Sequence, residues 1–355
     1  MIPLQYPALI GVGGVGTGQF FMLNGDHTLG REESRSGHFL ERQDYCKLHI
    51  IAHYVKTLLG PTFTAIPVSR IGADEAGRRL RGEMELAGLD LRYLVEDPDR
   101  PTLFSFCFLY PDGSGGNLTT DNSAVDALEA QELDAVEPEF AHFKGQGIAL
   151  AAPEAPQAVR SALLRLGTRH QFLRVAALTS AETETPWAVD LLRQADLSAL
   201  NLDEAARLAQ QDPAGLEPEQ VVTAAIAALG VINPRLKISV TAGARGSWSW
   251  DGAALQHVPA CAVPVINTAG AGDAHLAGLL AGLSWGLKLG HAQEVGTLVA
   301  AQSVTSPHTI HPGIRPEGLF SFARQIQAPI SRTVNRVLAE LASYSLSGGI
   351  HHGSH

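Results

Sequence analysis

Short apolar segments alternate with amphipathic ones from Ile148 onward, and this alternation limits the fold more than any other feature of the sequence. The apolar segments have the length of buried strands, and the amphipathic ones carry apolar residues at helical spacing. Such alternation predicts a doubly wound α/β fold, a mostly parallel sheet with helices on both faces. The expected strands lie at 148–151, 173–178, 199–202 and 238–241, and the expected helices at 156–166, 187–194, 203–210 and 219–229.

The amino-terminal part has a weaker pattern. We expect a short buried strand at 9–13, an irregular stretch at 14–37, a helix at 40–59, a strand at 62–68, and a helix that Asp74 caps and that ends near Leu86. Residues 103–109 and 117–120 flank a glycine-rich turn and predict a hairpin. This hairpin is the one stretch that looks like a separate small layer.

Composition and charge argue against several classes of protein. The chain has 355 residues, 45% of them hydrophobic, and a formal net charge of −10, which does not suit the binding of nucleic-acid phosphates. Cys46, Cys107 and Cys261 lack metal-ligand spacing and indicate reduced thiols in a cytoplasmic protein. We expect no signal peptide and no membrane span. The histidines of the tail at 351–355 indicate a disordered end or a tag remnant rather than a metal site.

The run N-T-A-G-A-G-D at 267–273, followed by a small-residue apolar helix, carries the strongest chemical signal. Small residues at a helix N-terminus expose backbone N–H groups that can hold an oxyanion or a phosphate. The carboxylate of Asp273 can take a proton from a hydroxyl beside that phosphate. Such a group suits phosphoryl transfer to an alcohol, although the run on its own is equally compatible with a turn before a packed helix.

Three further segments follow the same edge of the expected sheet. Asn201 and Glu204 share one face where a strand runs into a helix, and they fit either a magnesium–phosphate site or an ordinary helix cap. The segment T-A-G-A-R-G at 241–246 fits either a turn that approaches phosphates or a plain hairpin turn. The apolar face of a helix at 295–304 fits an adenine pocket or simple core packing.

In this order and spacing the four segments resemble the ribokinase (PfkB-type) carbohydrate kinase family. The resemblance covers about residues 148–307 and is weaker at I-G-A-D-E-A-G in 71–77. The family pattern D-T-x-G-A-G-D is present with one substitution, Asn267 for Asp. The resemblance implies a ribokinase-like doubly wound sheet with a small β-sheet lid, and an ATP-dependent kinase that uses Mg²⁺ and acts on a sugar or related small molecule.

The resemblance also implies roles for individual residues. Asp273 would be the catalytic base, and Gly270, Ala271 and Gly272 would form the anion hole for the transferred phosphoryl group. Asn201 and Glu204 match the N-x-x-E motif that organises magnesium and phosphates, with Glu204 acting on the metal indirectly. Thr241, Gly243 and Gly246 match the nucleotide-binding T-x-G-x-x-G segment.

The acceptor side departs from the family. Gly18 stands where the family usually has an Asp, and the stretch C-K-L-H-I-I at 46–51 lacks the family's G-G-x-x-x-N signature. Candidate replacements that would contact the substrate are Asp26, Asn122 and Glu154, each of which also fits an ordinary turn or helix start. Because Asn267 removes one carboxylate, the monovalent-cation site of many family members is not carried over.

We expect a kinase domain over 1–330, with a lid from about 14–39 and 101–120, and a carboxyl-terminal helix and disordered tail over 331–355. The lid also offers a sheet edge through which two copies could form a homodimer. The alternatives are a nucleoside kinase, a non-catalytic sugar- or nucleoside-binding protein on the same fold, and a dehydrogenase. The dehydrogenase rests on G-x-G-x-x-G at 11–16, with Glu32 or Glu33 as its ribose-binding acid.

Overall fold

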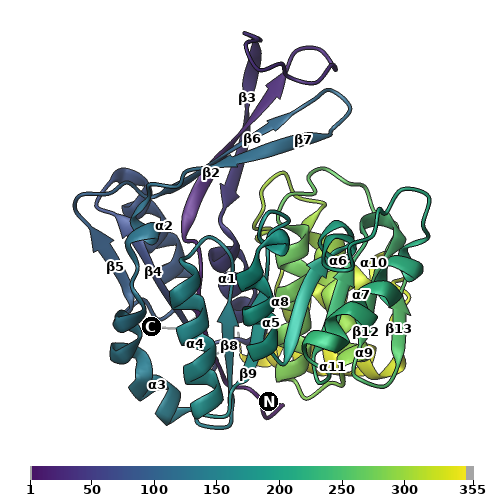
Figure 1. Ribbon diagram of the computed structural model, residues 1–355. Helices are drawn as coiled ribbons and strands as arrows, with labels where there is room; N and C mark the ends of the chain where they lie inside the picture. Colours follow the sequence, from purple (N-terminus) through teal and green to yellow (C-terminus); the bar gives the residue numbers. More distant parts are fainter. Residues whose placement is uncertain (1, 349–355) are drawn as a thin grey trace, which may run out of the picture.

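The computed structural model describes residues 2–348, and its main body is a nine-stranded sheet in the order β13-β12-β11-β10-β9-β8-β1-β4-β5 (Figure 1). The strands from β11 to β5 are parallel to their neighbours, whereas β12 and β13 are antiparallel at one edge. The predicted doubly wound sheet is therefore confirmed. The strands are β1 (Ala8–Val12), β4 (Thr64–Gly72), β5 (Leu94–Asp97), β8 (Gly147–Ala151), β9 (Leu173–Ala177), β10 (Leu197–Asn201), β11 (Lys237–Thr241), β12 (Ser247–Trp250) and β13 (Leu255–Val258).

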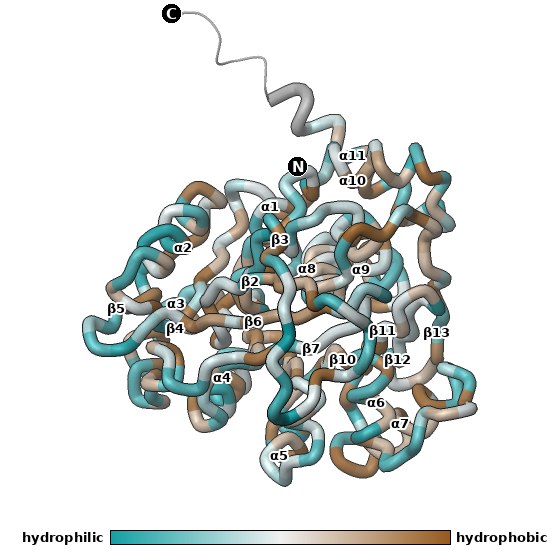
Figure 2. Tube along the Cα trace, turned by 90° about the horizontal axis from the view of Figure 1, so that it is seen from above, coloured by the Kyte–Doolittle hydropathy of each residue, from teal (hydrophilic) through white to brown (hydrophobic). Residues whose placement is uncertain are grey.

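Helices cover both faces of this sheet because its strands are apolar on both sides. In β1, Leu9 packs into the core formed with α1, α8 and α9, whereas Ile10 and Val12 pack into the core formed with α4, α5 and α7. The outer helix α2 is largely hydrophilic (Figure 2). The α-helices are α1 (Lys47–Leu59), α2 (Glu75–Leu86), α3 (Glu137–His142), α4 (Gln157–Arg169), α5 (Pro186–Gln194), α6 (Leu202–Leu208), α7 (Pro218–Ile232), α8 (Ala271–Ser284), α9 (Leu289–Ser303), α10 (Pro316–Gln325) and α11 (Arg332–Gly348).

The direction of winding changes between β1 and β8. β4 and β5 continue the sheet on one side of β1, and β8 to β11 continue it on the other. In doubly wound sheets the crevice at the carboxyl ends of the two strands that flank such a switch point binds ligands. The carboxyl ends of β1 and β8 are followed by Gly13 and by Ala152, so the residues that follow these positions are candidates for a site.

A separate four-stranded sheet, the lid, projects from this end of the body (Figure 1). Its order is β3-β2-β6-β7, from β2 (Gly16–Leu23), β3 (Gly37–Tyr45), β6 (Leu103–Leu109) and β7 (Gly115–Thr119). The hairpin predicted at 103–109 and 117–120 is confirmed by β6 and β7.

Two predictions for the segment before α1 are wrong. The stretch expected to be irregular contains β2, and the first part of the helix expected at 40–59 is the end of β3, so that α1 begins only at Lys47. β2 pairs with β3 on one side and with β6 on the other, and these non-local partners override a weak local pattern. The dinucleotide-binding alternative fails for the same reason, because the glycines at 11–16 lead into a strand and not into the helix that this fingerprint requires.

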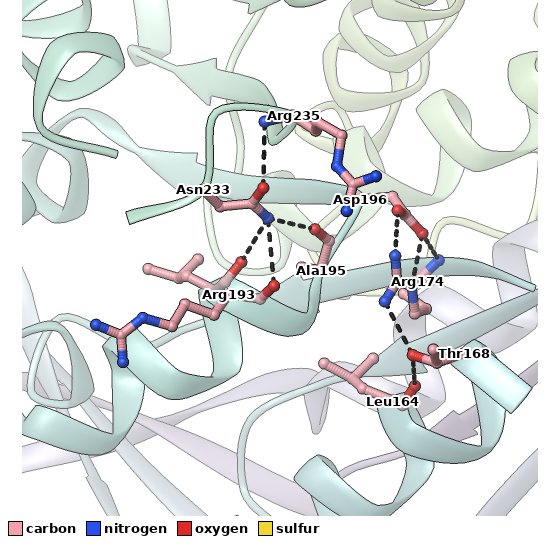
Figure 3. Close-up of polar contacts among 9 residues, drawn as sticks. Leu164, Thr168, Arg174, Arg193, Ala195, Asp196, Asn233 and Arg235 are labelled. Carbon is pink, nitrogen blue, oxygen red and sulfur yellow. Dashed lines mark hydrogen bonds and ion pairs between the residues drawn. The ribbon is translucent and has the colours of Figure 1, made fainter. Parts of the chain in front are cut away.

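A polar network connects neighbouring strands at the end of the sheet opposite the lid (Figure 3). Arg174 at the start of β9 makes a two-pronged ion pair with Asp196, which precedes β10; its Nε and Nη2 donate at 2.9 and 2.6 Å. The Asn233 amide donates to the carbonyl of Ala195 at 2.8 Å. These contacts connect the amino-terminal ends of the strands. They lie at the opposite end of the sheet from the candidate site at the carboxyl ends.

The carboxyl-terminal helix α11 belongs to the same core, because its Val334 and Leu338 are fully buried with residues of α8 and α9. The predicted disordered tail at 349–355 lies outside the described residues. Within residues 2–348, no helix combines the length and apolar character needed to cross a bilayer.

Candidate active site

The glycine-rich run begins helix α8 with a left-handed residue. Gly270 has φ 74° and ψ −1°, a conformation that favours glycine, and a Cβ there would lie 3.1 Å from Thr309 Cβ. The Ala271 N–H donates to the Thr268 carbonyl at 3.2 Å. The N–H groups of Gly272 and Asp273 donate to no acceptor within the described residues. They are therefore free to hold an anion at this helix N-terminus.

The carboxylate of Asp273 faces the ammonium group of Lys47, the first residue of α1. Lys47 Nζ lies 3.6 Å from Asp273 Oδ1, and the side chains are 33% and 15% exposed. Burial raises the pKa of Asp273, and the Lys47 charge opposes that rise. The carboxylates of Asp273, Glu154 and Glu204 raise the pKa of Lys47. Sequence reasoning missed Lys47, although it is a single charged residue at the head of an apolar helix.

Glu154 lies at the switch point of the sheet. Its backbone has φ 65°, which is unusual for a residue with a side chain, and its Oε2 accepts from the Lys47 N–H at 3.2 Å. The carboxylate thus caps α1 from a different part of the chain. Burial raises the pKa of Glu154, and Lys47 opposes this. The structure therefore brings this predicted substrate residue beside the base.

Asn201 and Glu204 form a reciprocal cap at the start of α6. The Glu204 N–H donates to Asn201 Oδ1 at 2.8 Å, and the Asn201 N–H donates to Glu204 Oε2 at 2.9 Å. The helix-cap interpretation is thus correct, yet both residues also line a small cavity of about 70 Å³ together with Lys47 and Asp273. Glu204 is 8% exposed, and burial raises its pKa to about 7.

A larger cavity of about 530 Å³ adjoins the small one. The two cavities share Thr241, Gly272 and His275 in their walls. The volume of the larger cavity is within the range of small-molecule and cofactor pockets. Its wall is made by the turn after β11, the loop before α8, the start of α8 and one face of α9, with lining residues Thr241, Gly243, Ala244, Gly246, Ser247, Ala260, Cys261, Ala262, Val263, Val265, Thr268, Ala271, Gly272, His275, Thr297, Ala300, Ala301 and Val304.

Thr241, Gly243 and Gly246 of the predicted nucleotide-binding turn therefore lie together at this larger cavity, whereas Asn201 and Glu204 line the small one. Gly243 and Gly246 have φ 53° and 90°, so the turn after β11 has a backbone shape that glycine allows. Ala300 and Ala301 of α9, with Val304 directly after it, supply the apolar wall expected of an adenine pocket, while Val295 is in the core.

Oxygen ligands for a magnesium ion are available at the small cavity. Within residues 2–348 no three histidine, cysteine, aspartate or glutamate side chains form a metal cage. Mg²⁺ bound to a nucleotide needs only one or two carboxylates, because water and phosphate oxygens complete its shell. Glu204, buried at the cavity with Oε1 not engaged by Asn201, fits that requirement.

Two predicted substrate residues lie apart from this cluster. Asn122 is exposed in the bend after β7. Asp26 is exposed in the turn between β2 and β3, and at about 3.4 Å per residue it lies on the order of 25 Å along the lid from Gly18.

Asn267 stabilises the loop before α8. Its Nδ2 donates to the Pro307 carbonyl at 3.0 Å, and its Oδ1 accepts from the Ala269 N–H at 3.1 Å. An aspartate could not make the first of these bonds, because it lacks the N–H donor. The substitution in the family pattern therefore has a structural role here.

Comparison with solved structures shows the same fold in ribokinases. The chain matches a ribokinase from Giardia lamblia with a TM-score of 0.74 and 14% identity, covering 88% of this chain and 99% of that one. It matches a ribokinase from Cryptococcus neoformans var. grubii, solved in complex with ADP, with a TM-score of 0.71 and 20% identity, covering 90% and 99%.

Curated relatives match over a shorter stretch. Fructoselysine 6-kinases from Shigella flexneri and Escherichia coli (strain K12) are each 43% identical over 67 residues, or 19% of this chain. The chain spans about a quarter of the length of these relatives (26%).

The family profile described as "pfkB family carbohydrate kinase" matches residues 51–315, well over half of the chain. This match contains the whole of the predicted nucleotide and phosphoryl-transfer site. The chain belongs to the pfkB family of carbohydrate kinases.

Proposed function

We propose that this protein transfers the γ-phosphoryl group of ATP to a hydroxyl group of a sugar or a related small molecule. The observation that carries the proposal is the position of Asp273. Its carboxylate lies at the N-terminus of α8, 3.6 Å from Lys47 Nζ, in a cavity that shares walls with a nucleotide-sized pocket. A base, free N–H groups and a nucleotide pocket are therefore adjacent.

The proposed transfer step uses Asp273 as the proton acceptor and the N–H groups at the start of α8 as the anion hole. The acceptor hydroxyl gives its proton to Asp273, and its oxygen forms a bond to the γ-phosphorus while the bond to the β,γ-bridging oxygen breaks and ADP leaves. The backbone from Gly270 to Gly272, with the N–H groups of Gly272 and Asp273, holds the charge on the transferred group.

Lys47 has two effects in this mechanism. Burial raises the pKa of Asp273, and the positive charge of Lys47 opposes this rise and so favours the ionised form of the base. Once Asp273 takes the proton and becomes neutral, the ammonium group is released from its ion pair and lies beside the negatively charged phosphoryl group.

Glu204 and Asn201 complete the nucleotide side of the proposed site. An ionised Glu204 would hold Mg²⁺ through a water molecule or directly, and the ion would neutralise charge on the β- and γ-phosphates. Asn201 keeps the carboxylate in place through the reciprocal cap.

The three cysteines are free thiols, which suits the proposed cytoplasmic location.

An activity screen with ATP and a panel of sugars, polyols and nucleosides would identify the acceptor. Fructoselysine belongs in the panel because the curated relatives are named for it. A thermal-shift series with ATP, NAD and sugars separates the remaining alternatives, because a bound ligand stabilises the folded protein. Stabilisation by a sugar without ATP turnover would identify a binding protein.

Replacing Asp273 by Asn should lower kcat by about 10²- to 10⁴-fold, because the amide cannot accept the hydroxyl proton. ATP binding, measured by calorimetry, should persist, because the pocket residues are unchanged. Asp203→Asn is the matched control, since Asp203 is exposed beside the site. Near-normal ATP-dependent turnover in the Asp273 variant would contradict its assignment as the base.

Replacing Lys47 by Met should lower kcat by about 10²-fold and move the acidic limb of the pH–rate profile to higher pH, because Asp273 then loses the charge that lowers its pKa. Lys288→Met serves as the control, because Lys288 is exposed directly before α9, in the connection that follows α8. An unchanged acidic limb would show that Lys47 does not act on the base.

The affinity for MgATP should fall as the pH falls through about 7, because Glu204 becomes protonated there and a neutral carboxyl group binds the ion poorly. Steady-state KM for MgATP, measured from about pH 6 to about pH 8, should rise toward the acidic end. In Glu204→Gln the KM should be high at every pH, while Glu219→Gln, an exposed position, should behave as the wild type. Equal slopes in the wild type and Glu204→Gln would contradict the role of Glu204.

We also propose that the lid mediates a homodimer. β3 and β7 are its edge strands, and one face carries the packed rings of Phe21, Phe39 and Phe106, with Phe39 58% exposed. Exposed aromatic clusters and open sheet edges suit association.

Light scattering should give twice the mass of one chain, and Phe39→Ser should shift the protein toward the monomer. Leu86→Ser, which removes an exposed leucine of α2, should leave the mass unchanged. A monomeric wild type at all concentrations would remove this proposal.

A further inference from the structure

We propose that Asp44 binds hydroxyl groups of the acceptor, and that it supplies from strand β3 the carboxylate that strand β2 lacks at Gly18. The inference rests on the proposed kinase function and names a residue that determines which acceptor is used. It implies an acceptor that presents hydroxyl donors, and no negative charge, toward the base of the lid.

Asp44 occupies the space that a side chain at position 18 would fill. Gly18 and Asp44 are directly paired in the β2–β3 ladder. A Cβ at Gly18 would lie 2.4 Å from Asp44 Oδ2 and 2.9 Å from the Ser105 carbonyl oxygen. Paired residues on neighbouring strands point to the same face of a sheet. The carboxylate from β3 therefore lies over β2 at Gly18.

This carboxylate also lies near the transfer site. Asp44 is three residues before Lys47, and the intervening Tyr45 N–H donates to Thr309 Oγ1 at 3.1 Å. Thr309 in turn contacts the start of α8, because its Cβ is 3.1 Å from the position of a Cβ on Gly270. Thr309 therefore connects the base of the lid, next to Asp44, with the proposed anion hole. Burial raises the pKa of Asp44, and the charge of Asp273 adds a smaller contribution in the same direction.

Asp44 has unused hydrogen-bonding capacity. It is 7% exposed and forms no ion pair with a lysine or arginine of the described chain. Its neighbours are neutral donors: Cys107 Sγ lies 3.5 Å from Oδ2, and Thr309 and the Tyr45 N–H favour its charged form. A carboxylate has about four lone-pair positions, and a thiol is a weak donor. The remaining lone-pair positions of this carboxylate are available to hydroxyl donors from a ligand.

The same face of the lid is polar beyond Asp44. Ser105 is paired with Gly18 and with Thr119 on the two neighbouring strands, and the Ser105 and Thr119 hydroxyl oxygens are 3.4 Å apart. Cys107 Sγ also lies 3.7 Å from Asn117 Oδ1, so its single S–H can donate either to Asn117 or to Asp44. Hydroxyl and amide groups thus lie around Asp44 on this face, which also carries the buried ring of Phe20, paired with Cys107. The polar groups around Asp44 suit the hydroxyl groups of a ligand.

Electrostatics also limits the charge that the acceptor can carry near Asp44. The charge of Asp273 acts on Asp44 as a small repulsion beside the larger effect of burial. A carboxylate or phosphate on the acceptor at this point would add a third negative charge, which like-charge repulsion disfavours. A neutral sugar or polyol with adjacent hydroxyl groups would instead donate to both carboxylates, one hydroxyl to Asp44 and the reacting one to Asp273.

The test compares Asp44→Asn and Asp44→Ala with the wild type in ATP-dependent phosphorylation of D-fructose and D-ribose. In Asp44→Asn, the KM for the sugar should rise by about 10- to 100-fold, the loss expected for one or two hydrogen bonds to a charged group. The kcat and the KM for MgATP should change by less than about threefold, because the transfer site is untouched. Asp112→Asn, in the exposed turn between β6 and β7, should match the wild type.

Monodeoxy analogues of the preferred sugar give a measurement that would not change if Asp44 had a purely structural role. In the wild type, one analogue that lacks the contacted hydroxyl should have a raised KM. In Asp44→Asn and Asp44→Ala, the ratio of KM values for that analogue and the parent sugar should approach one, because the lost hydroxyl no longer has a partner.

The outcomes separate this inference from the proposed function. An unchanged sugar KM in Asp44→Asn, an unchanged deoxy-to-parent ratio, or an equal rise in the KM for MgATP would overturn the role of Asp44 while leaving the kinase assignment in place. A wild-type protein that neither binds nor phosphorylates any sugar of the panel would overturn both proposals.

Discussion

The site depends on the burial of several carboxylates around one ammonium group. Asp273, Glu154 and Glu204 all have raised pKa values because burial disfavours their charged forms. Carboxylates in such a place require a cation or N–H donors to stay ionised. Lys47 supplies both: its Nζ faces Asp273 at 3.6 Å, and its N–H donates to Glu154 at 3.2 Å. The N-termini of α1 and α8 therefore meet at the same group of acids, which their helix dipoles also favour.

This arrangement ties the lid to the transfer site. The Cys46 N–H donates to the Gly16 carbonyl at 3.2 Å, so the turn before Lys47 is held against the first residue of β2. The segment from Asp44 to Lys47 ends a lid strand and begins α1, and it carries one charged side chain toward Gly18 and another toward Asp273. A shift of this turn would move both charges together. The lid and the partner of the proposed base are thus connected through a four-residue segment.

The sequence predicted the parts of the site that depend on local structure. The glycine at 270, the N-terminus of α8 and the reciprocal cap of Asn201 and Glu204 are each set by residues within a few positions of one another, and such patterns are readable without a fold. Lys47 and Asp44 could not be predicted in the same way, because their neighbours come from distant parts of the chain. Their positions depend on β2, whose partners in β3 and β6 are non-local and whose glycines hide the strand pattern.

The phosphoryl side and the acceptor side of the site also differ in how far their residues can be substituted. The phosphoryl side is built from backbone N–H groups at the start of α8 and from a glycine turn after β11, and backbone groups are not changed by a side-chain substitution. The proposed acceptor side is built from side chains on lid strands. Because directly paired residues in an antiparallel ladder have Cβ atoms only about 5 Å apart and on one face, a carboxylate can change strands and still reach the same point. Gly18 and Asp44 form such a pair. A departure from the family pattern on the lid is therefore compatible with an unchanged transfer site around Asp273, since the two halves rest on different kinds of chemical group.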